Sequence, residues 1–225
     1  MNYQKGHEEL VVFSLVSPPK GVQLLSGVAD VDGFYHANGL AQYPSQTLGP
    51  GDPGYPFQDT YSIAYCESNP QFMARVGGNR EQGTYNGATS KDSGLTWTQF
   101  SNWISPTAIP LRVAMSAKDP DHMVVTVSGG NAVQTIDGGV SWRNVTGLPK
   151  SPTGPWYWSQ HLAADSIQEE TFYYYYAGGD FYLSQDSGLS FQIVNSQLPA
   201  EDWAMVKATP GVAGELWLSL YCPGS

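Results

Sequence analysis

Apolar residues occur along this chain in short runs rather than at helical spacing. Runs rich in β-branched and aromatic side chains, such as 123–127 and 172–176, alternate with turns that contain Gly, Pro or acidic residues. No long segment repeats apolar residues at the i, i+3, i+4 spacing of an amphipathic helix. The pattern predicts an all-β chain of short antiparallel strands joined by tight turns.

The strands recur in repeated units. Strand-like runs centred on Ile63, Val113, Leu162 and Val206 follow one another at steps of 50, 49 and 44 residues. This period is typical of a β-propeller blade, in which four antiparallel strands occupy roughly 40–50 residues. We therefore predict a propeller built from such blades.

An eight-residue pattern closes each of the first three units, as SKDSGLTW at 90–97, TIDGGVSW at 135–142 and SQDSGLSF at 184–191. In this Asp-box motif the Asp is expected to accept hydrogen bonds within its own turn, the Gly to allow positive φ, and the last aromatic to pack between sheets. This structural role is assigned to Asp92, Gly94, Trp97, Asp137, Gly139, Trp142, Asp186, Gly188 and Phe191. Trp203 and Trp217 are also expected in the core.

The units divide the chain into an N-terminal segment and a series of blades, at 1–60, 61–110, 111–159, 160–203 and, truncated, 204–225. If the N-terminal segment supplies part of a further blade, the result is an incomplete ring of about four to five blades, fewer than the roughly six to eight that usually close one. An open ring leaves sheet edges exposed. We therefore expect a fragment, or a ring that another chain completes.

Charge and composition argue against some classes of binding partner. With 10 Lys and Arg against 20 Asp and Glu, the chain has a net charge of −10, which argues against a nucleic-acid partner. No apolar stretch approaches the ~20 residues that span a bilayer, so no membrane partner is expected. An acidic surface is compatible with a neutral polysaccharide. The first residues lack the features of a secretion signal, which favours an internal piece of a longer exported protein.

Metal and disulfide chemistry are not indicated. Cys66 and Cys222 are the two cysteines and are predicted to be unpaired thiols, with a disulfide between them as the alternative. The histidines show no ligand spacing, so neither a metal site nor another cofactor is expected.

The N-terminal segment carries a distinctive run, EELVVFSLVSPPKG at 8–21, followed by LLSGVADVDGF at 24–34. It resembles glycoside hydrolase family 74, whose second propeller domain opens with a similar run. Similar phrases continue along nearly the whole chain, at 69–70, 75–77, 92–98, 162–165, 181–182 and 210–218.

The resemblance implies one half of an enzyme in which two propellers face each other and hydrolyse β-1,4-glucan links of xyloglucan with inversion, in endo or reducing-end-specific mode. On this resemblance Asp30 is the general acid, and Asp32, where the family usually has a small residue, is the fallback. The base would come from a missing N-terminal propeller, since the family's RTDVGGAYR-like element is absent from this sequence. The parent protein is expected to be extracellular, and the chain alone to have little or no activity.

An inverting glycosidase needs one protonated and one ionised carboxyl, about 6.5–9.5 Å apart. The apolar residues that flank Asp30 are predicted to shield it from water and so favour the protonated form that the acid role requires. The alternative is that Asp30 only makes a turn with Gly33.

Six aromatic residues are candidates for contact with the sugar: Trp156, Tyr157, Trp158, His161, Tyr35 and His36. Residues 156–158 and His161 lead into the first strand of the third unit, where a cleft is expected, and the alternative is that they cover the blade core. The Gly- and Pro-rich loop at 40–59 is expected to wall the cleft beside Asp30.

Two other function classes remain open. The chain could be a non-catalytic Asp-box propeller that binds a glycan or a protein. A sialidase is less consistent with the sequence, because the arginine triad that binds the substrate carboxylate is not recognisable among Arg75, Arg80, Arg112 and Arg143.

Overall fold

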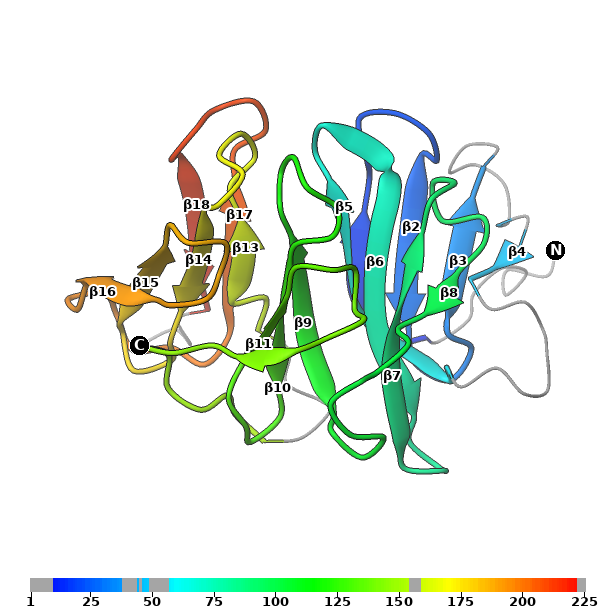
Figure 1. Cartoon of the computed structure of the whole chain (residues 1–225), viewed down its shortest axis with the longest axis horizontal. Coiled ribbons are helices and arrows are strands. Elements are labelled where there is room, and N and C mark those ends of the chain that lie inside the picture. The colour runs from blue at the N-terminus through cyan, green and yellow to red at the C-terminus, as the bar shows by residue number, and fades with distance from the viewer. Residues whose placement is uncertain (1–9, 38–43, 45, 49–56, 154–158, 222–225) are drawn as a thin grey trace, which may run out of the picture.

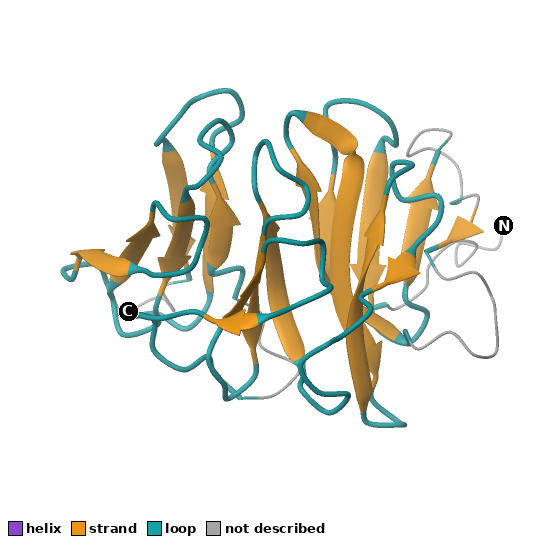
Figure 2. Cartoon of the chain, in the orientation of Figure 1, coloured by secondary structure: helices purple, strands orange, loops and turns teal. Residues whose placement is uncertain are grey.

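A computed structural model describes residues 10–37, 44, 46–48, 57–153 and 159–221, and the strands of this part of the chain form four antiparallel four-stranded sheets and one two-stranded sheet (Figure 1). Strands and connecting loops make up the whole described portion (Figure 2). Among these residues there is no helix of the length and apolar character needed to cross a membrane.

Each sheet is a meander of consecutive strands. The first consists of β1 (Val12–Val16), β2 (Leu24–Val28), β3 (Gly33–His36) and β4 (Gln46–Thr47). The second consists of β5 (Asp59–Cys66), β6 (Asn69–Asn79), β7 (Thr84–Ser90) and β8 (Thr98–Gln99). The third consists of β9 (Pro110–Met115), β10 (Met123–Val127), β11 (Val133–Thr135) and β12 (Arg143–Asn144). The fourth consists of β13 (Leu162–Ala164), β14 (Phe172–Tyr175), β15 (Phe181–Ser184) and β16 (Gln192–Asn195), and the last of β17 (Ala204–Ala208) and β18 (Leu216–Leu220).

The all-β prediction is confirmed, with four antiparallel strands in each complete blade. The N-terminal segment also holds a full sheet, β1 to β4, rather than part of one. The sequence pattern predicted only part of this sheet, because β4 has only two residues and the sequence around it is rich in strand-breaking residues.

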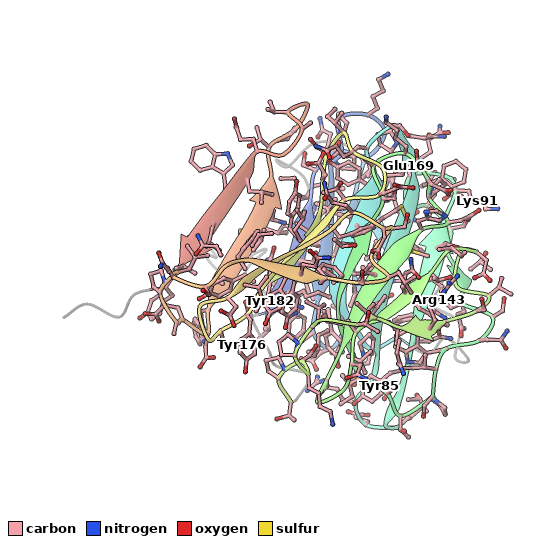
Figure 3. All side chains as sticks on the ribbon, turned by 60° about the vertical axis from the view of Figure 1, so that its left-hand side comes forward. Tyr85, Lys91, Arg143, Glu169, Tyr176 and Tyr182 are labelled. Carbon is pink, nitrogen blue, oxygen red and sulfur yellow. The ribbon has the colours of Figure 1, made fainter. Side chains whose placement is uncertain are left out.

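The sheets stand side by side in an arc, with β1, β5, β9, β13 and β17 as successive inner strands (Figure 1). The inner strands begin at one face of the arc, which also holds the β2–β3, β6–β7, β10–β11 and β14–β15 turns. We call it the Asp30 face, because Asp30 lies in the β2–β3 turn. Tyr85 and Tyr176, near two of these turns, lie toward the bottom of Figure 3, whereas Lys91 and Glu169 lie toward the top, at the opposite face.

Apolar clusters between neighbouring sheets hold the arc together. Leu25 and Met73 meet between the first two sheets, and Met123 and Val125 join the cluster between the second and third. Both strands at the centre, β9 and β10, are buried along their whole length. Each such side chain contributes roughly 1.5–3 kcal/mol by leaving water. The free thiol of Cys66 is buried in the same core, and Cys222 lies outside the described residues.

The expectation that Trp203 and Trp217 lie in the core is wrong. Their exposed fractions are 57% and 70%. In the β17–β18 sheet, Ala204 and Val206 face the β13–β16 sheet, while Trp217 is on the other side, where no further sheet lies among the described residues. Trp203 directly precedes β17, and strand alternation puts it on the same open side as Met205 and Trp217.

The three Asp-box turns share one geometry. Asp137 accepts hydrogen bonds from the Ser141 amide at 2.8 Å, the Ser141 hydroxyl at 2.5 Å and the Thr135 hydroxyl at 2.7 Å. The hydrogen bonds from Ser141, followed by that from Thr135, lower the pKa of Asp137 to about 2. Asp92 and Asp186 make the equivalent bonds to Ser90 and Thr96, and to Ser184 and Ser190. These carboxylates are engaged in holding their own turns.

The Gly and the aromatic residue of each motif tie the turn to its sheet. Gly94, Gly139 and Gly188 have φ of 87°, 90° and 82°, a region that L side chains rarely adopt. Trp97 lies over Arg75, Trp142 packs in a tilted arrangement against Phe100 at 5.1 Å between ring centroids, and Phe191 joins the core between the third and fourth sheets.

We expect Gly139→Ala to destabilise the fold more than Gly211→Ala does. Both glycines have positive φ, so each substitution carries a backbone cost of about 1–2 kcal/mol. A Cβ at position 139 would also lie 2.4 Å from the Phe100 ring, whereas one at 211 meets nothing within 4 Å. The steric overlap adds about 1–3 kcal/mol. Urea unfolding of the two variants measures the difference, and equal losses would contradict this packing.

Candidate functional site

The β2–β3 turn carries both aspartates of the predicted site in a strained backbone. Asp30 and Asp32 have φ of 71° and 68°, which are uncommon for residues other than Gly and cost of order 1–3 kcal/mol each. The turn is closed by hydrogen bonds from the Val28 amide to the Asp32 carbonyl at 3.1 Å and from the Val31 amide to the Ala29 carbonyl at 2.9 Å. Because of this geometry, the two carboxylates face different surroundings.

Asp32 points into the protein and is 4% exposed. Its carboxylate lies 2.6 Å from Nη1 of Arg75 and accepts a hydrogen bond of 2.5 Å from the Thr60 hydroxyl. The buried Arg75 guanidinium lies between two rings, 4.6 Å from the centroid of Phe57 and 4.7 Å from that of Trp97. Burial lowers the pKa of Arg75, and the Asp32 charge opposes that shift. Asp32 is therefore the counter-ion of Arg75, and its fallback assignment as the acid is not supported.

Asp30 points outward on its face of the arc. Its side chain is 62% exposed and forms an ion pair with Nη2 of Arg80, and its amide donates to Oδ1 of Asp59 at 2.9 Å. Asp59 is fully buried and also accepts from Nε of Arg80 at 2.5 Å and from the Tyr61 hydroxyl at 3.1 Å. Asp59 thus holds both the backbone of the turn and the cation beside Asp30.

Burial and the neighbouring carboxylates shift the pKa values of Arg80 and Tyr61. Burial acts to lower the pKa of Arg80, but the Asp59 hydrogen bond and the charges of Asp59 and Asp30 outweigh it and raise that pKa. Burial, followed by the Asp59 charge, raises the pKa of Tyr61. Tyr61 and Arg80 therefore keep their protons and remain donors to Asp59.

The apolar shielding predicted for Asp30 is not found in the described residues. Ala29 and Val28 are buried beneath the turn, but Val31 is 41% exposed and does not cover the carboxylate. Flanking apolar residues in the sequence could not show this, because the left-handed backbone turns the Asp30 side chain away from them. Any removal of water from Asp30 has to come from a surface that approaches its face.

Tyr35 and His36 do not lie beside Asp30. The register pairs Leu24 with His36 and Gly27 with Gly33, so β3 runs from the Asp30 turn toward the opposite end of the sheet. Tyr35 is buried against the second sheet, and burial, followed by the charge of Asp92, raises its pKa. The Nε2 atom of His36 lies 3.5 Å from the Ser26 hydroxyl, and burial lowers the pKa of His36.

His161 is a core residue. It has no exposed surface, lies 3.2 Å through Nε2 from the Thr126 hydroxyl, and makes an edge contact with Tyr174 at 4.9 Å between ring centroids. The structure therefore corrects its predicted contact with substrate. Trp156, Tyr157 and Trp158 lie outside the described residues, as does most of the loop at 40–59.

The starts of the inner strands are linked across the Asp30 face. Arg112 is buried and donates to the carbonyls of Tyr61 and Ser159, each at 2.9 Å. The Ser159 hydroxyl donates to the Ala204 carbonyl at 2.9 Å. This chain of contacts runs from the second blade to the last described sheet, and makes the face one connected surface.

A cavity of about 420 Å³ follows the inner strands, lined by Val16, Ile63, Val113, Leu162 and Val206 among others. It lies along the axis of the arc, and Asp30 is not part of its lining. Within the described portion of the chain, no three His, Cys, Asp or Glu side chains are grouped to hold a metal ion.

Sequence reasoning missed Asp59 and Arg80 as parts of this site. Arg80 lies in the β6–β7 turn, the equivalent in the second blade of the β2–β3 turn that carries Asp30. The two residues are 50 positions apart, which is one blade period. A search for charged residues one period after Asp30 would have found Arg80.

The comparisons with known proteins agree on one group of enzymes. No family model matches the sequence. A xyloglucanase of Paenibacillus is 34% identical over 219 residues, covering 96% of this chain, and a probable oligoxyloglucan-reducing end-specific xyloglucanase of Neosartorya fischeri is 30% identical over 96% of it. The chain spans only 20% and 28% of the length of these two relatives.

The solved structure of a xyloglucanase of glycoside hydrolase family 74 from Xanthomonas campestris superposes with a TM-score of 0.78 at 27% identity. The match covers 95% of this chain and 29% of that protein.

Burial of neutral His161 makes stability depend on pH. Burial, followed by the charge of Arg112, lowers its pKa to about 3, against about 6.5 in an unfolded chain. Between these values the unfolded state binds one more proton, so the stability present above pH 6.5 falls by up to about 1.4 kcal/mol per pH unit as the pH decreases toward 3. Urea unfolding at pH 7, 6 and 5 should show this slope, and His161→Phe should flatten it. The control His122→Phe should keep it, and an unchanged slope in His161→Phe would contradict the assignment.

Proposed function

Over 95–96% of its length this chain is homologous to one part of the xyloglucanases of glycoside hydrolase family 74, and we propose that it contributes the general acid, Asp30, and half of the substrate cleft to an inverting enzyme that cleaves β-1,4-glucan links of xyloglucan. The observation that carries the proposal is an exposed carboxylate held in a strained turn by buried charges. Such strain is characteristic of functional sites.

Asp30 would donate its proton to the oxygen of the leaving sugar. A second carboxylate must activate water from the other side of the ring, about 6.5–9.5 Å away. The neighbouring carboxylates cannot do this, because Asp32 and Asp59 are 4% and 0% exposed and are engaged by Arg75 and Arg80. The base is therefore proposed to come from a facing propeller. Because the proposed substrate is a polysaccharide, we also propose that the parent protein works outside the cell.

The ion pair with Arg80 defines what the facing surface has to do. The Arg80 guanidinium lies beside the Asp30 carboxylate, so a positive charge is in place next to the group that would lose its proton. The facing propeller and the substrate would cover the 62% exposed side chain of Asp30. In this proposal Asp30 acts as a general acid only in the complete cleft and not in the chain alone.

A second candidate is a non-catalytic propeller that binds a glycan. The same ion pair favours it, because in the chain alone the Asp30 carboxylate is engaged by Arg80. The two candidates differ in whether Asp30 is needed for bond cleavage.

In a protein that joins this chain to a facing propeller with the base, Asp30→Ala should lower kcat on xyloglucan by about 10²–10⁴-fold, the usual contribution of a general acid. Hydrolysis of an aryl glycoside of a xyloglucan oligosaccharide with a strongly acidic phenol as leaving group should be much less affected, because this leaving group needs no proton. Glu81→Gln, an exposed carboxylate near Arg80, is the matched control and should keep full turnover. Unchanged xyloglucan turnover in Asp30→Ala would refute the acid role.

The chain alone should bind xyloglucan oligosaccharides without hydrolysing them, because it carries one wall of the cleft and lacks the base. Calorimetric titration measures the binding, and a reducing-sugar assay measures cleavage. Robust hydrolysis by the chain alone would overturn the proposed division of the two carboxyl groups.

A further inference from the structure

The inner strands enclose a second, smaller pocket beside the central cavity, which we call the hub pocket. Its volume is about 50 Å³, all five inner strands contribute to its lining, and it shares Ile63 and Val113 with the larger cavity. Tyr61, near the start of β5, and Gln160, just before β13, place it toward the Asp30 face. Pockets for sugars and other organic ligands are larger, roughly 300–1,000 Å³. The hub pocket has room for a small ion or a few water molecules, since one water needs about 10–15 Å³.

Two serine hydroxyls line the hub pocket with a hydrogen left to donate. Ser14 on β1 and Ser62 on β5 are 8% and 6% exposed. The Ser14 hydroxyl accepts from the Ile63 amide and the Ser62 hydroxyl from the Val113 amide, each at 3.2 Å. A hydroxyl that accepts in this way still has its own hydrogen to donate. Within the described part of the chain neither hydroxyl donates to a protein acceptor, so both can donate to a ligand in the pocket.

Two cationic side chains line the same pocket. Arg112 is 4% exposed, and its guanidinium is fixed between the inner strands by hydrogen bonds of 2.9 Å to the carbonyls of Tyr61 and Ser159. Lys207 on β17 as a whole remains exposed, but burial of its ammonium group, followed by the charge of Arg112, lowers its pKa. The two positive charges therefore repel each other at the hub pocket.

The lining of the hub pocket favours negative charge. Among the described residues that line it there is no carboxylate, and none of the ion pairs between described residues includes Lys207. The chain as a whole has a net charge of −10, but the potential inside a pocket is set mainly by the nearest charges. A water molecule would accept from the serine hydroxyls without offsetting the repulsion between Lys207 and Arg112, whereas an anion does both.

We propose that the hub pocket binds a small inorganic anion of the size and charge of chloride, held by the hydroxyls of Ser14 and Ser62 and by the charges of Arg112 and Lys207. Since these groups come from β1, β5, β9 and β17, the anion joins blades that are distant in the sequence and stabilises the arc. Three of the four side chains are buried between inner strands, and only Lys207 comes from the last described sheet. The inference goes beyond the proposed function and does not depend on the role of Asp30.

Urea unfolding of the chain in sodium chloride and in sodium gluconate, at equal ionic strength, tests the site. A ligand that binds only the folded state increases the free energy of unfolding as its concentration rises. We expect the urea midpoint to rise with chloride and not with gluconate, which is too large for the hub pocket. Equal ionic strength keeps the screening of surface charges constant.

Substitutions locate the effect within the molecule. Lys207→Met should remove most of the chloride dependence, and Lys207→Arg should keep most of it. Ser62→Ala should weaken the apparent chloride affinity by about tenfold or more, the usual effect of losing a hydrogen bond to a charged group. Lys91→Met removes an exposed lysine at the opposite face and is the matched control, which should keep the full dependence. The dependence is measured within each variant, so a general loss of stability does not enter the comparison.

Crystals of the chain grown in sodium bromide give an independent readout. Bromide scatters X-rays anomalously, and we expect a peak within hydrogen-bonding distance of the Ser62 hydroxyl and the Lys207 ammonium group that is absent in Lys207→Met. A chloride dependence that is unchanged in Lys207→Met overturns the anion site, and so does the absence of a bromide peak from the hub pocket. Either result leaves the proposed role of Asp30 standing, because that role is tested by turnover.

Discussion

The buried ion pair between Asp32 and Arg75 is the interaction on which the site depends. It joins the first blade to the second, and with the Asp59 carboxylate it holds a turn in which two non-glycine residues adopt left-handed backbone. Breaking one partner of such a pair leaves an uncompensated buried charge and typically costs about 3–5 kcal/mol. The packing of Phe57 and Trp97 around Arg75 removes water from the pair and limits its freedom. The exposed position of Asp30 follows from this buried arrangement.

Much of the architecture was predictable because each blade repeats local chemistry. The Asp-box residues make their hydrogen bonds within one turn, so their spacing in the sequence carries the geometry. The strand runs and the period near 50 residues likewise reflect one meander after another. Trp203 and Trp217 were assigned wrongly, because hydrophobicity alone does not tell whether a neighbouring sheet covers a residue.

The site was less predictable, because its contacts join turns of different blades. The role of Asp30 was predicted by resemblance and stays a prediction, but its partners Arg80 and Asp59 come from the second blade, and no local pattern links them. His161 shows the opposite failure. A polar aromatic residue near an expected cleft suggested contact with sugar, yet its hydrogen-bonding partner and the ring beside it lie in the core.

The most direct test of the account is a double-mutant cycle between Asp59→Asn and Asp30→Asn, measured as kcat on xyloglucan in a protein that also carries the facing propeller. If the buried charges serve to position Asp30, Asp59→Asn lowers kcat with little change in KM, and the double variant is no slower than Asp30→Asn alone. If Asp59→Asn slows the Asp30→Asn enzyme by the same factor as it slows the unsubstituted one, Asp59 acts independently of Asp30 and the account is contradicted.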